Sequence, residues 1–274
     1  PTDWTASDVI ITLVVTDGQS GAGSVEVKKD GTPMTVSGSG GTYTFTVSEN
    51  GDYAVTATDM AGNAQSETVT VSKIDKGTPT LTVAGGMQSA ASLDLTVSAN
   101  APGGSGVTVT VTKDGQDAGT VQNGSYTVTS TGIYTFTATT GAGLSATQKV
   151  TVHSIVFEND SAPYETHLVL SDGKVTEPAK PTKDGYTFIG WYNKADLQCI
   201  NLPEWNFDYP VFENMELVAQ WMEARPISTD PITYLDKDGN QQVCTAYTVL
   251  TSETKASILD YADKWYDLPA GWYV

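Results

Sequence analysis

The chain has 274 residues, of which 39% are hydrophobic, so its length allows two or more domains with apolar cores. No apolar run is long enough to cross a bilayer, and we expect no membrane insertion within this segment. The 32 acidic residues outnumber the 14 basic ones, and a net charge of -18 would repel a phosphate backbone, which argues against nucleic acid as a partner.

The cysteine and histidine content argues against metal sites, cofactors and catalysis. Cys199 and Cys244 are too few for a disulfide framework, although they could pair with each other. They lie in different expected modules, and we expect neither to be essential for folding. His153 and His167 are too few for a histidine-rich metal site. We therefore predict no catalytic residue, no metal ligand and no cofactor, and we assign no ligand-binding residue.

Residues 1–152 have the pattern of antiparallel strands. Leu93, Leu95 and Val97 alternate with polar residues, a period of two that places one face of a strand in a core and the other in water. Short clusters of glycine, aspartate and asparagine interrupt such runs, and no segment has a helical period. The sequence therefore predicts an all-β fold for this region.

The same region contains an internal duplication. Two copies of one module follow each other, and several short strands within so small a unit suggest a β-sandwich. The matched segments are Ile11, Leu13 and Val15 with Leu93, Leu95 and Val97; Lys29-Asp30-Gly31 with Lys113-Asp114-Gly115; Gly51-Asp52-Tyr53 with Gly132-Ile133-Tyr134; and Ala61-Gly62 with Ala142-Gly143.

Both copies resemble bacterial immunoglobulin-like domains of surface proteins. The resemblance rests on Asp3-Trp4-Thr5, on Asp17 with Ser20-Gly21, and on the run from Thr56 to Asn63. It implies one sandwich at residues 1–75 and a second at residues 76–153. The first copy has no counterpart of Thr80-Leu81-Thr82-Val83, so we expect it to lack its first strand.

Aromatic residues become frequent from residue 154 onward. Expected elements are a strand at Ile155-Val156-Phe157, a hairpin from His167 to Val175 around Asp172-Gly173, a strand from Tyr186 to Tyr192, a loop from Pro203 to Tyr209, and a last strand from Glu216 to Trp221. Tyr186, Phe188 and Trp191 cannot all face water, and Trp221 would supply an opposing aromatic surface. We expect these side chains to form the core of a small module.

This segment resembles the internalin B-type, or Listeria-Bacteroides, repeat of Gram-positive surface proteins. The motif runs from Pro181 to Tyr192 and continues with Phe207-Asp208 and with Leu217 to Trp221. The resemblance implies a β-grasp-like module, with an α+β tendency, at residues 154–223.

In residues 224–274 we expect the start of a further, truncated β-rich module. Ile232 to Leu235 and Val243 to Val249 read as strands around the turn Asp236 to Asn240, and Ser257 to Trp265 as a short helix or loop. The turn resembles a calcium loop, but its glycine comes at position 4 instead of position 6 and no glutamate stands at position 12. We expect a plain hairpin turn.

Other polar residues could form a calcium site or an isopeptide bond. Asp17, Asp59, Asn63 and Asp75 could meet around Ca²⁺ at a junction between modules, although acids also simply occupy turns. An isopeptide bond could join Lys28, Lys29 or Lys149 to Asn63 or Asn100. The sequence does not decide whether either stabilises the modules.

Catalysis and sugar binding have weaker sequence support. Neither His153 nor His167 lies near a Gly-x-Ser-x-Gly motif. Glu204 and Asp208 could imitate the carboxylate pair of a glycosidase, but the spacing of two acids among 32 is almost no evidence for one. A sugar-stacking platform would use Trp205, Trp265 and Trp272, but we expect these side chains to pack in cores or junctions.

The sequence as a whole predicts a non-catalytic, extracellular stalk or adhesin segment, attached to the surface or wall of a Gram-positive cell. Such a segment would project or present a binding region and could contact a host protein or a glycan, and we expect a monomer. One alternative is a set of carbohydrate-binding modules attached to a secreted glycan-degrading enzyme. A second is an accessory region of a surface protease. Aromatic side chains exposed in one planar row would favour the carbohydrate-binding alternative.

Overall fold

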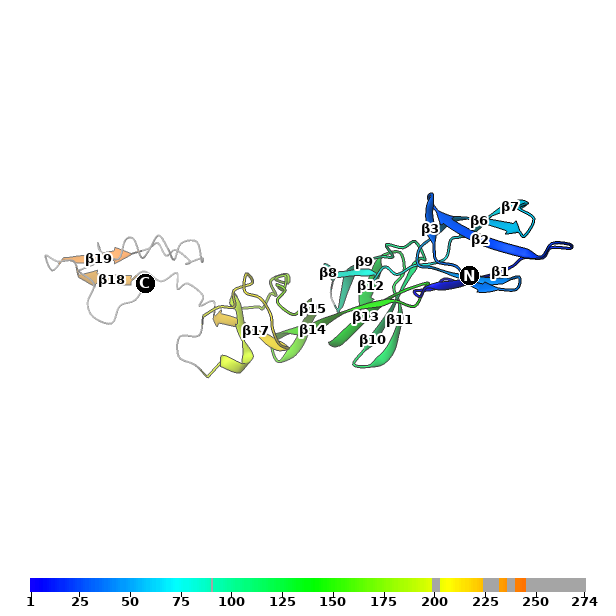
Figure 1. Cartoon of the computed structure of the whole chain (residues 1–274). Coiled ribbons are helices and arrows are strands. Elements are labelled where there is room, and N and C mark those ends of the chain that lie inside the picture. Colours follow the sequence, from blue (N-terminus) through cyan, green and yellow to red (C-terminus); the bar gives the residue numbers. More distant parts are fainter. Residues whose placement is uncertain (90, 199–202, 224–231, 236–239, 245–274) are drawn as a thin grey trace. The chain divides into compact units, whose positions relative to one another are not determined.

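A computed structural model describes residues 1–89, 91–198, 203–223, 232–235 and 240–244 of the chain (Figure 1). Their regular elements are strands and one turn of 3-10 helix, which confirms the β-rich fold class, and none of these residues forms a helix that could span a bilayer. The elements are β1 (Val9–Val14), β2 (Ala22–Lys29), β3 (Thr32–Met34), β4 (Ser37–Ser39), β5 (Thr42–Val47), β6 (Gly51–Asp59), β7 (Ala64–Val71), β8 (Thr80–Ser89), β9 (Ser92–Asn100), β10 (Val107–Lys113), β11 (Gln116–Thr120), β12 (Ser125–Val128), β13 (Gly132–Thr140), β14 (Ser145–Asn159), β15 (Ala162–Leu170), β16 (Tyr186–Asn193), η1 (Lys194–Asp196), β17 (Met215–Glu223), β18 (Ile232–Leu235) and β19 (Gln241–Cys244).

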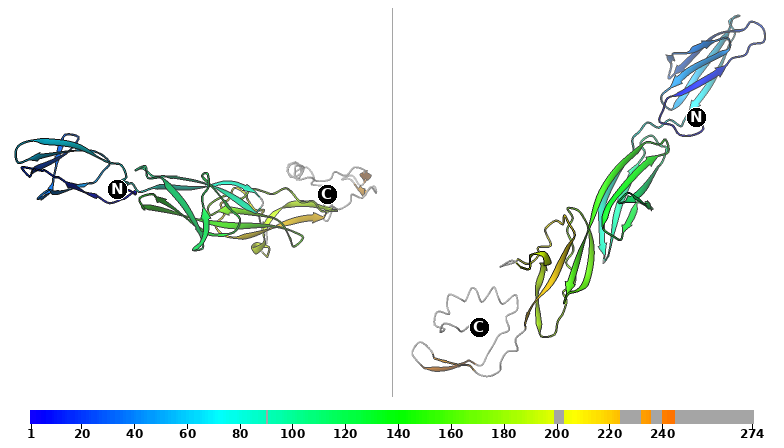
Figure 2. Two further views of the ribbon diagram at one scale, coloured as in Figure 1. Left: turned by 90° about the vertical axis from the view of Figure 1, so that its right-hand side faces the viewer. Right: turned by 90° about the horizontal axis from the view of Figure 1, so that it is seen from below.

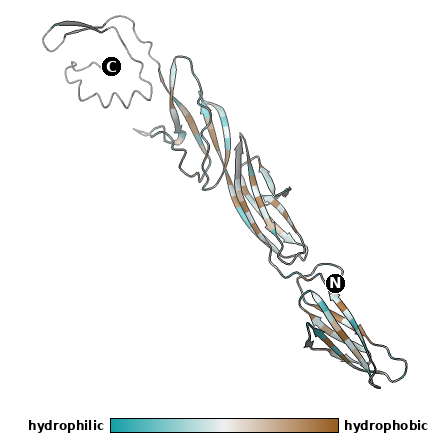
Figure 3. Cartoon of the chain, turned by 90° about the horizontal axis from the view of Figure 1, so that it is seen from above, coloured by the Kyte–Doolittle hydropathy of each residue, from teal (hydrophilic) through white to brown (hydrophobic). Residues whose placement is uncertain are grey.

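Alternation of apolar and polar residues places the strands as the sequence predicts. In β9, Leu93, Leu95 and Val97 are buried, whereas Asp94 and Thr96 between them are exposed. Figure 3 shows hydrophobic and hydrophilic residues alternating along many strands. Strands with this alternation therefore present one apolar face to a partner sheet.

The first sandwich, residues 1–72, consists of two antiparallel sheets. Their strand orders are β1-β5-β4 and β3-β2-β6-β7. Val27, Phe45 and Tyr53, which come from both sheets, are buried in one core, and the rings of Phe45 and Tyr53 lie 5.9 Å apart. Within the described part of the chain, β1 lies at the edge of its sheet, whereas its counterpart β9 lies between β12 and β8.

The second sandwich, residues 76–152, has sheets ordered β12-β9-β8 and β11-β10-β13-β14. It repeats backbone hydrogen bonds of the first sandwich. Val15 N–H donates to the Gly41 carbonyl and Val97 N–H to the Gly124 carbonyl, both at 2.8 Å. These equivalent bonds agree with the predicted duplication, and the immunoglobulin-like assignment itself stays a prediction.

Strand β14 continues from the second sandwich into the repeat module, residues 153–223 (Figures 1 and 2). From Ser145 to Val152 it pairs with β13, and from Val152 to Asn159 it pairs with β15. It also pairs in parallel with β17, from Ile155 to Glu158. The predicted change of module at residue 154 therefore falls inside one uninterrupted strand.

The core of the second sandwich and the core of the repeat module lie on opposite faces of β14. Val152 is buried in the core of the second sandwich, together with Leu168 of β15. Ile155 and Phe157 are buried and project from the other face, where the Phe157 ring lies 4.9 Å from that of Trp191. The second sandwich and the repeat module thus share a two-stranded ribbon that is buried on both faces.

The repeat module departs from the sequence prediction at its hairpin. Asp172 has a positive φ and Gly173 N–H bonds the Leu170 carbonyl at 2.8 Å, so the predicted turn exists. The chain after it forms no returning strand, however, and Gly173 bridges Val211 instead. The hairpin predicted from His167 to Val175 is therefore wrong. The strand that pairs with β15 is β14, across the turn at Asp160.

The other predicted elements of the repeat are present. Strands β16 and β17 contain the predicted strands, residues 203–209 form a loop, and the described residues of the repeat include no α-helix. Of the described residues, 181–189, 221–223, 232–235 and 240–244 belong to a second compact unit. Within that unit, the rings of Phe188 and Trp221 lie 5.6 Å apart.

The predicted fourth module is described only at β18 and β19, which pair antiparallel. The strand at Ile232–Leu235 is confirmed, and β19 covers the beginning of the strand predicted from Val243 to Val249. The turn from Asp236 to Gly239, the helix or loop at 257–265, Cys199, Trp265 and Trp272 lie outside the described residues.

Candidate functional site

The segment that joins the two sandwiches is held by hydrogen bonds to the first sandwich. The Asn50 amide oxygen accepts the Ile74 N–H at 2.8 Å, and its nitrogen donates to the Ile74 carbonyl at 2.9 Å. Thr5 adds a parallel bridge to Ile74, and the Lys76 ammonium pairs with Asp8. Polar groups of two segments, the turn before β6 and the residues before β1, therefore fix a segment that the sequence presents as a linker.

The next residue fixes the same segment to the second sandwich. Asp75 is only 1% exposed, and its carboxylate accepts the Ser105 hydroxyl at 2.5 Å, the Gly77 N–H at 2.9 Å and the Ser105 N–H at 3.3 Å. The Ser105 hydroxyl bond, more than any other contact, lowers the pKa of Asp75, while burial opposes that shift. The buried carboxylate is thus compensated by neutral donors.

Glycine at position 103 makes room for this carboxylate. A Cβ added to Gly103 would lie 1.8 Å from Asp75 Oδ1, far inside contact distance. These contacts form the joint, defined here as Asn50, Ile74, Asp75, Gly103 and Ser105. Its hydrogen bonds are those of a structural connection, because the Asp75 carboxylate is 1% exposed and accepts hydrogen bonds from residues of the joining segment and of the second sandwich.

The structure separates Asp75 from the other residues that were considered for a calcium site. Asp17 accepts the Gly21 N–H at 2.5 Å, and Asp59 accepts both the backbone and side-chain N–H of Asn63 at 2.8 Å. These bonds lower the pKa of each aspartate, chiefly through Gly21 and the Asn63 side chain respectively. Asp75 lies beyond the opposite end of β6 from Asp59, about 26 Å along the strand. The described residues contain no group of three acidic, histidine or cysteine side chains placed to hold a metal.

The lysines considered for an isopeptide bond have other surroundings. Lys28 pairs with Glu26 at 2.7 Å, and Lys29 pairs with Glu49. Asn63 is engaged by Asp59, and Lys149 is exposed. The structure therefore brings none of these lysines into a buried pair with Asn63.

The two histidines are part of the ribbon formed by β14 and β15. His167 Nε2 lies 2.9 Å from the Glu165 carboxylate, and its ring meets that of Phe157 edge-on at 5.1 Å. His153 Nε2 is buried and has no hydrogen-bond partner among the described residues. Both positions are those of packed side chains.

Glu204, Asp208 and Trp205 occupy one loop without converging on a site. Asp208 pairs with Lys174 at 3.1 Å and its side chain is 86% exposed. Glu204 lies against Gly190, and Trp205 is half-buried with its backbone N–H bonded to the Trp191 carbonyl at 2.7 Å. Trp205 is the one described member of the proposed sugar platform, and its packing agrees with the structural alternative.

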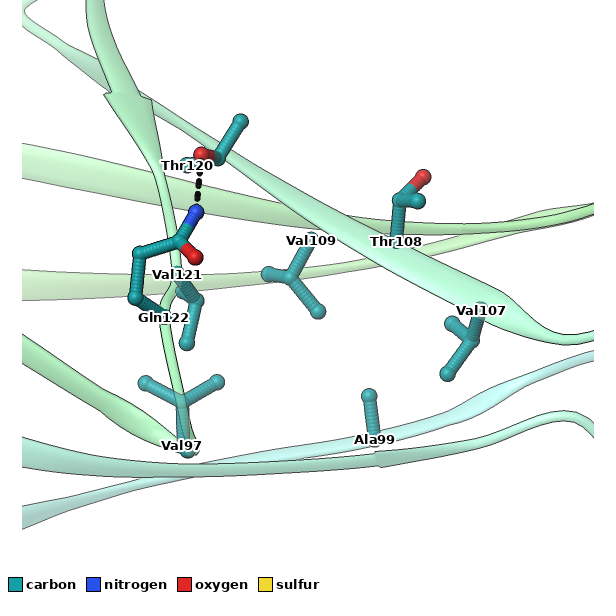
Figure 4. A pocket seen from close by; sticks show the side chains of 9 residues that line it. Val97, Ala99, Val107, Thr108, Val109, Thr120, Val121 and Gln122 are labelled. Carbon is teal, nitrogen blue, oxygen red and sulfur yellow. Dashed lines mark hydrogen bonds between the residues drawn. The ribbon is translucent and has the colours of Figure 1, made fainter.

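The second sandwich has an open groove of about 360 Å³ between its two sheets (Figure 4). Val97 and Ala99 of β9 face Val107 and Val109 of β10 across it. Its polar side chains are two threonines and Gln122, so it lacks titratable groups. The groove offers apolar contact but no acid–base chemistry.

A second, polar groove of about 480 Å³ lies beside η1 in the repeat module. Lys194 at its wall contacts Glu216 at 2.6 Å and Glu158 at 2.9 Å, and the hydrogen bond to Glu216 chiefly raises its pKa. Neither this cluster nor the hydrogen bonds of the Asp75 joint could be predicted from the sequence. Both connect residues far apart in the chain, and no local motif marks them.

Comparison with known proteins identifies the repeat. The family model of the Listeria-Bacteroides repeat domain matches residues 153–220, so the predicted repeat is shown. The chain is also 32% identical over 80 residues to a protein of Evansella cellulosilytica described as a "Putative membrane protein". That match covers 28% of this chain and 11% of the length of the relative. The repeat is one that occurs in bacterial surface proteins.

Proposed function

We propose that the chain is a non-catalytic stalk or adhesin segment of an extracellular bacterial surface protein, which projects or presents a binding region. Its Listeria-Bacteroides repeat supports the surface assignment. The observation that carries the stalk proposal is β14, one strand that belongs to both the second sandwich and the repeat module.

A stalk has to transmit force from one module to the next. Hydrogen bonds in a sheet lie across the strands, so a pull along β14 loads many of them at once. Strand β14 has partners along both of its parts, namely β13 in the sandwich and β15 and β17 in the repeat. Force applied at one module therefore reaches the other through covalent backbone within a paired strand.

Single-molecule stretching of the whole chain tests this proposal. We expect the second sandwich and the repeat module to unfold in one step that releases about 150 residues, or roughly 500 Å of chain. Two separate steps of about half that length would contradict mechanical coupling through β14. The first sandwich, which has its own sheets, supplies an internal comparison.

Absence of catalysis is the second part of the proposal. We expect no turnover of glycan or peptide libraries, because no nucleophile, base and orienting group are assembled in the described residues. Turnover that disappears in His167→Ala or Glu204→Gln would contradict it. Glycan-array binding that disappears when Tyr209 and Phe212, 59% and 62% exposed, are changed to alanine would favour the carbohydrate-binding alternative.

A further inference from the structure

The dipeptide Asn-Gly occurs twice in the chain, as Asn50-Gly51 and as Asn123-Gly124. The side-chain amide of an asparagine can be attacked by the backbone nitrogen of the next residue, and a side chain on that residue obstructs the attack. Glycine has no Cβ and leaves the amide carbon accessible. The sequence therefore permits this reaction most readily at these two asparagines.

Asn123 lies at the tip of the turn between β11 and β12. Asn123 and Gly124 have φ angles of 50° and 74°, as a two-residue hairpin turn requires. The flanking residues close the turn, because Ser125 N–H donates to the Gln122 carbonyl at 2.9 Å and Gln122 N–H donates to the Ser125 carbonyl at 3.3 Å. Both turn residues are exposed, and among the described residues nothing hydrogen-bonds the Asn123 side chain or the Gly124 N–H. No contact in the folded chain therefore holds the amide away from the attacking nitrogen.

Asn50 is followed by the same residue but has different surroundings. Its Oδ1 accepts the Ile74 N–H at 2.8 Å, and its Nδ2 donates to the Ile74 carbonyl at 2.9 Å. Gly51, which supplies the attacking nitrogen, begins β6 and pairs with Val71. Reaction at Asn50 therefore requires its side chain to leave the joint first.

We propose that Asn123 is a site of spontaneous deamidation, and that the hydrogen bonds of the joint protect Asn50 from the same reaction. Hydroxide removes the proton of the Gly124 N–H, and the nitrogen forms a bond to Asn123 Cγ. The bond from Cγ to Nδ2 breaks, and Nδ2 takes a proton from water and leaves as ammonia. Water then opens the resulting succinimide ring, at Cγ to give aspartate or at the backbone carbonyl carbon to give isoaspartate. This inference is independent of the stalk proposal.

The modified turn borders the groove of the second sandwich. Gln122 and Gly124 both line this groove, and Figure 4 shows Gln122 at its wall. Either product adds a negative charge beside a groove that has no titratable group. Isoaspartate also lengthens the main chain by a methylene group, which displaces the Gly124 carbonyl that accepts the Val97 N–H at 2.8 Å. Deamidation would therefore loosen the turn from β9.

Incubation of the full chain in mildly alkaline buffer, followed by tryptic peptide mapping with mass spectrometry, tests the inference. Residues 114–149 form one tryptic peptide, in which Asn123 is the only asparagine. In the folded chain we expect a mass gain of about 1 Da at Asn123 that develops at least about tenfold faster than the gain at Asn50. Isoaspartate and aspartate should both appear, because the ring opens in two ways. Equal rates at the two sites, or aspartate alone at Asn123, would overturn the inference.

Two controls separate the effect of the structure from that of the local sequence. In urea, where the joint is lost, Asn50 and Asn123 should react at similar rates, and a difference of about tenfold that persists there would overturn the protection by the joint. Asn123→Gly removes the amide and suits a turn with positive φ, so this variant should fold and its 114–149 peptide should gain no mass. An undiminished mass gain in that peptide would assign the reaction to another residue.

Hydrogen exchange measures the consequence for the groove. After incubation the Val97 amide should exchange faster in the wild type, because the Gly124 carbonyl no longer accepts it, and should stay slow in Asn123→Gly. Slow exchange of Val97 in a fully converted chain would overturn the proposed loosening of the turn.

Discussion

The carboxylate of Asp75 accepts the hydroxyl proton of Ser105, 30 residues further along the chain, at an oxygen–oxygen distance of 2.5 Å. The two residues belong to what the sequence presents as a linker and a loop. Their contact makes the segment between the sandwiches part of a folded joint. Its contribution to stability can be measured by removing one partner.

Asp75→Ala should destabilise the joint by about 1 to 3 kcal/mol, because it leaves the N–H groups of Gly77 and Ser105 without their acceptor. Trypsin should then cleave faster after the adjacent Lys76. Asp94→Ala is the control, since it removes one exposed hydrogen bond from Thr127 and should change stability by less than about 0.5 kcal/mol. An unchanged cleavage rate in Asp75→Ala would mean that the joint opens without this carboxylate.

The same carboxylate predicts a pH dependence. Because folding lowers the pKa of Asp75, its stabilisation is fully present above the unfolded value of about 3.9 and is lost as pH falls through the lower folded value. The Asp75→Asn variant should be less stable than the wild type at neutral pH. The difference in their free energies of unfolding should become smaller below about pH 4. Urea titrations of both proteins at several acidic pH values measure this difference, and a constant deficit would contradict the assignment.

Leu168→Ala should destabilise two modules. Leu168 lies in β15 of the repeat module, yet its side chain is 3% exposed in the core of the second sandwich. Emptying this site should cost about 2 to 5 kcal/mol and lower a calorimetric transition common to both modules. Val27→Ala, in the first sandwich, should leave that transition in place. Separate shifts of two transitions would show that the modules unfold independently.

Trp191→Ala should destabilise the repeat module by about 3 to 5 kcal/mol, because its side chain is 0% exposed and contacts Phe157. Trp191→Phe should cost less. The sequence suggests an equal cost for Trp221→Ala, but that side chain is only half-buried, so we expect a smaller loss. Chemical denaturation followed by circular dichroism compares the three variants, and a wild-type midpoint for Trp191→Ala would contradict the buried placement.

Local patterns predict the strands because burial follows the alternation of side chains. Leu93, Leu95 and Val97 are buried as their period of two predicts, and the aromatic motif correctly predicts a buried Trp191. Turn positions are also local, and Asp172 adopts the backbone conformation that its Asp-Gly pair favours.

Pairing partners are harder to predict, because they depend on residues distant in the sequence. The turn at Asp172 gives no sign that Gly173 will bridge Val211. The composition changes at residue 154, but composition does not reveal that β14 continues through the change. The joint is hidden for the same reason, since the acceptor Asp75 and the donor Ser105 belong to segments that look like ordinary loops.

Strand β14 restricts how many residues can be inserted or deleted where the two modules meet. Val152 faces one core and Ile155 the other, which requires an odd number of residue steps between them. Inserting or deleting one residue there would turn every downstream side chain of the strand to the wrong core, whereas a change of two would preserve both faces. Length variation at this boundary can therefore be tolerated only in pairs of residues, a constraint that a flexible linker would never impose.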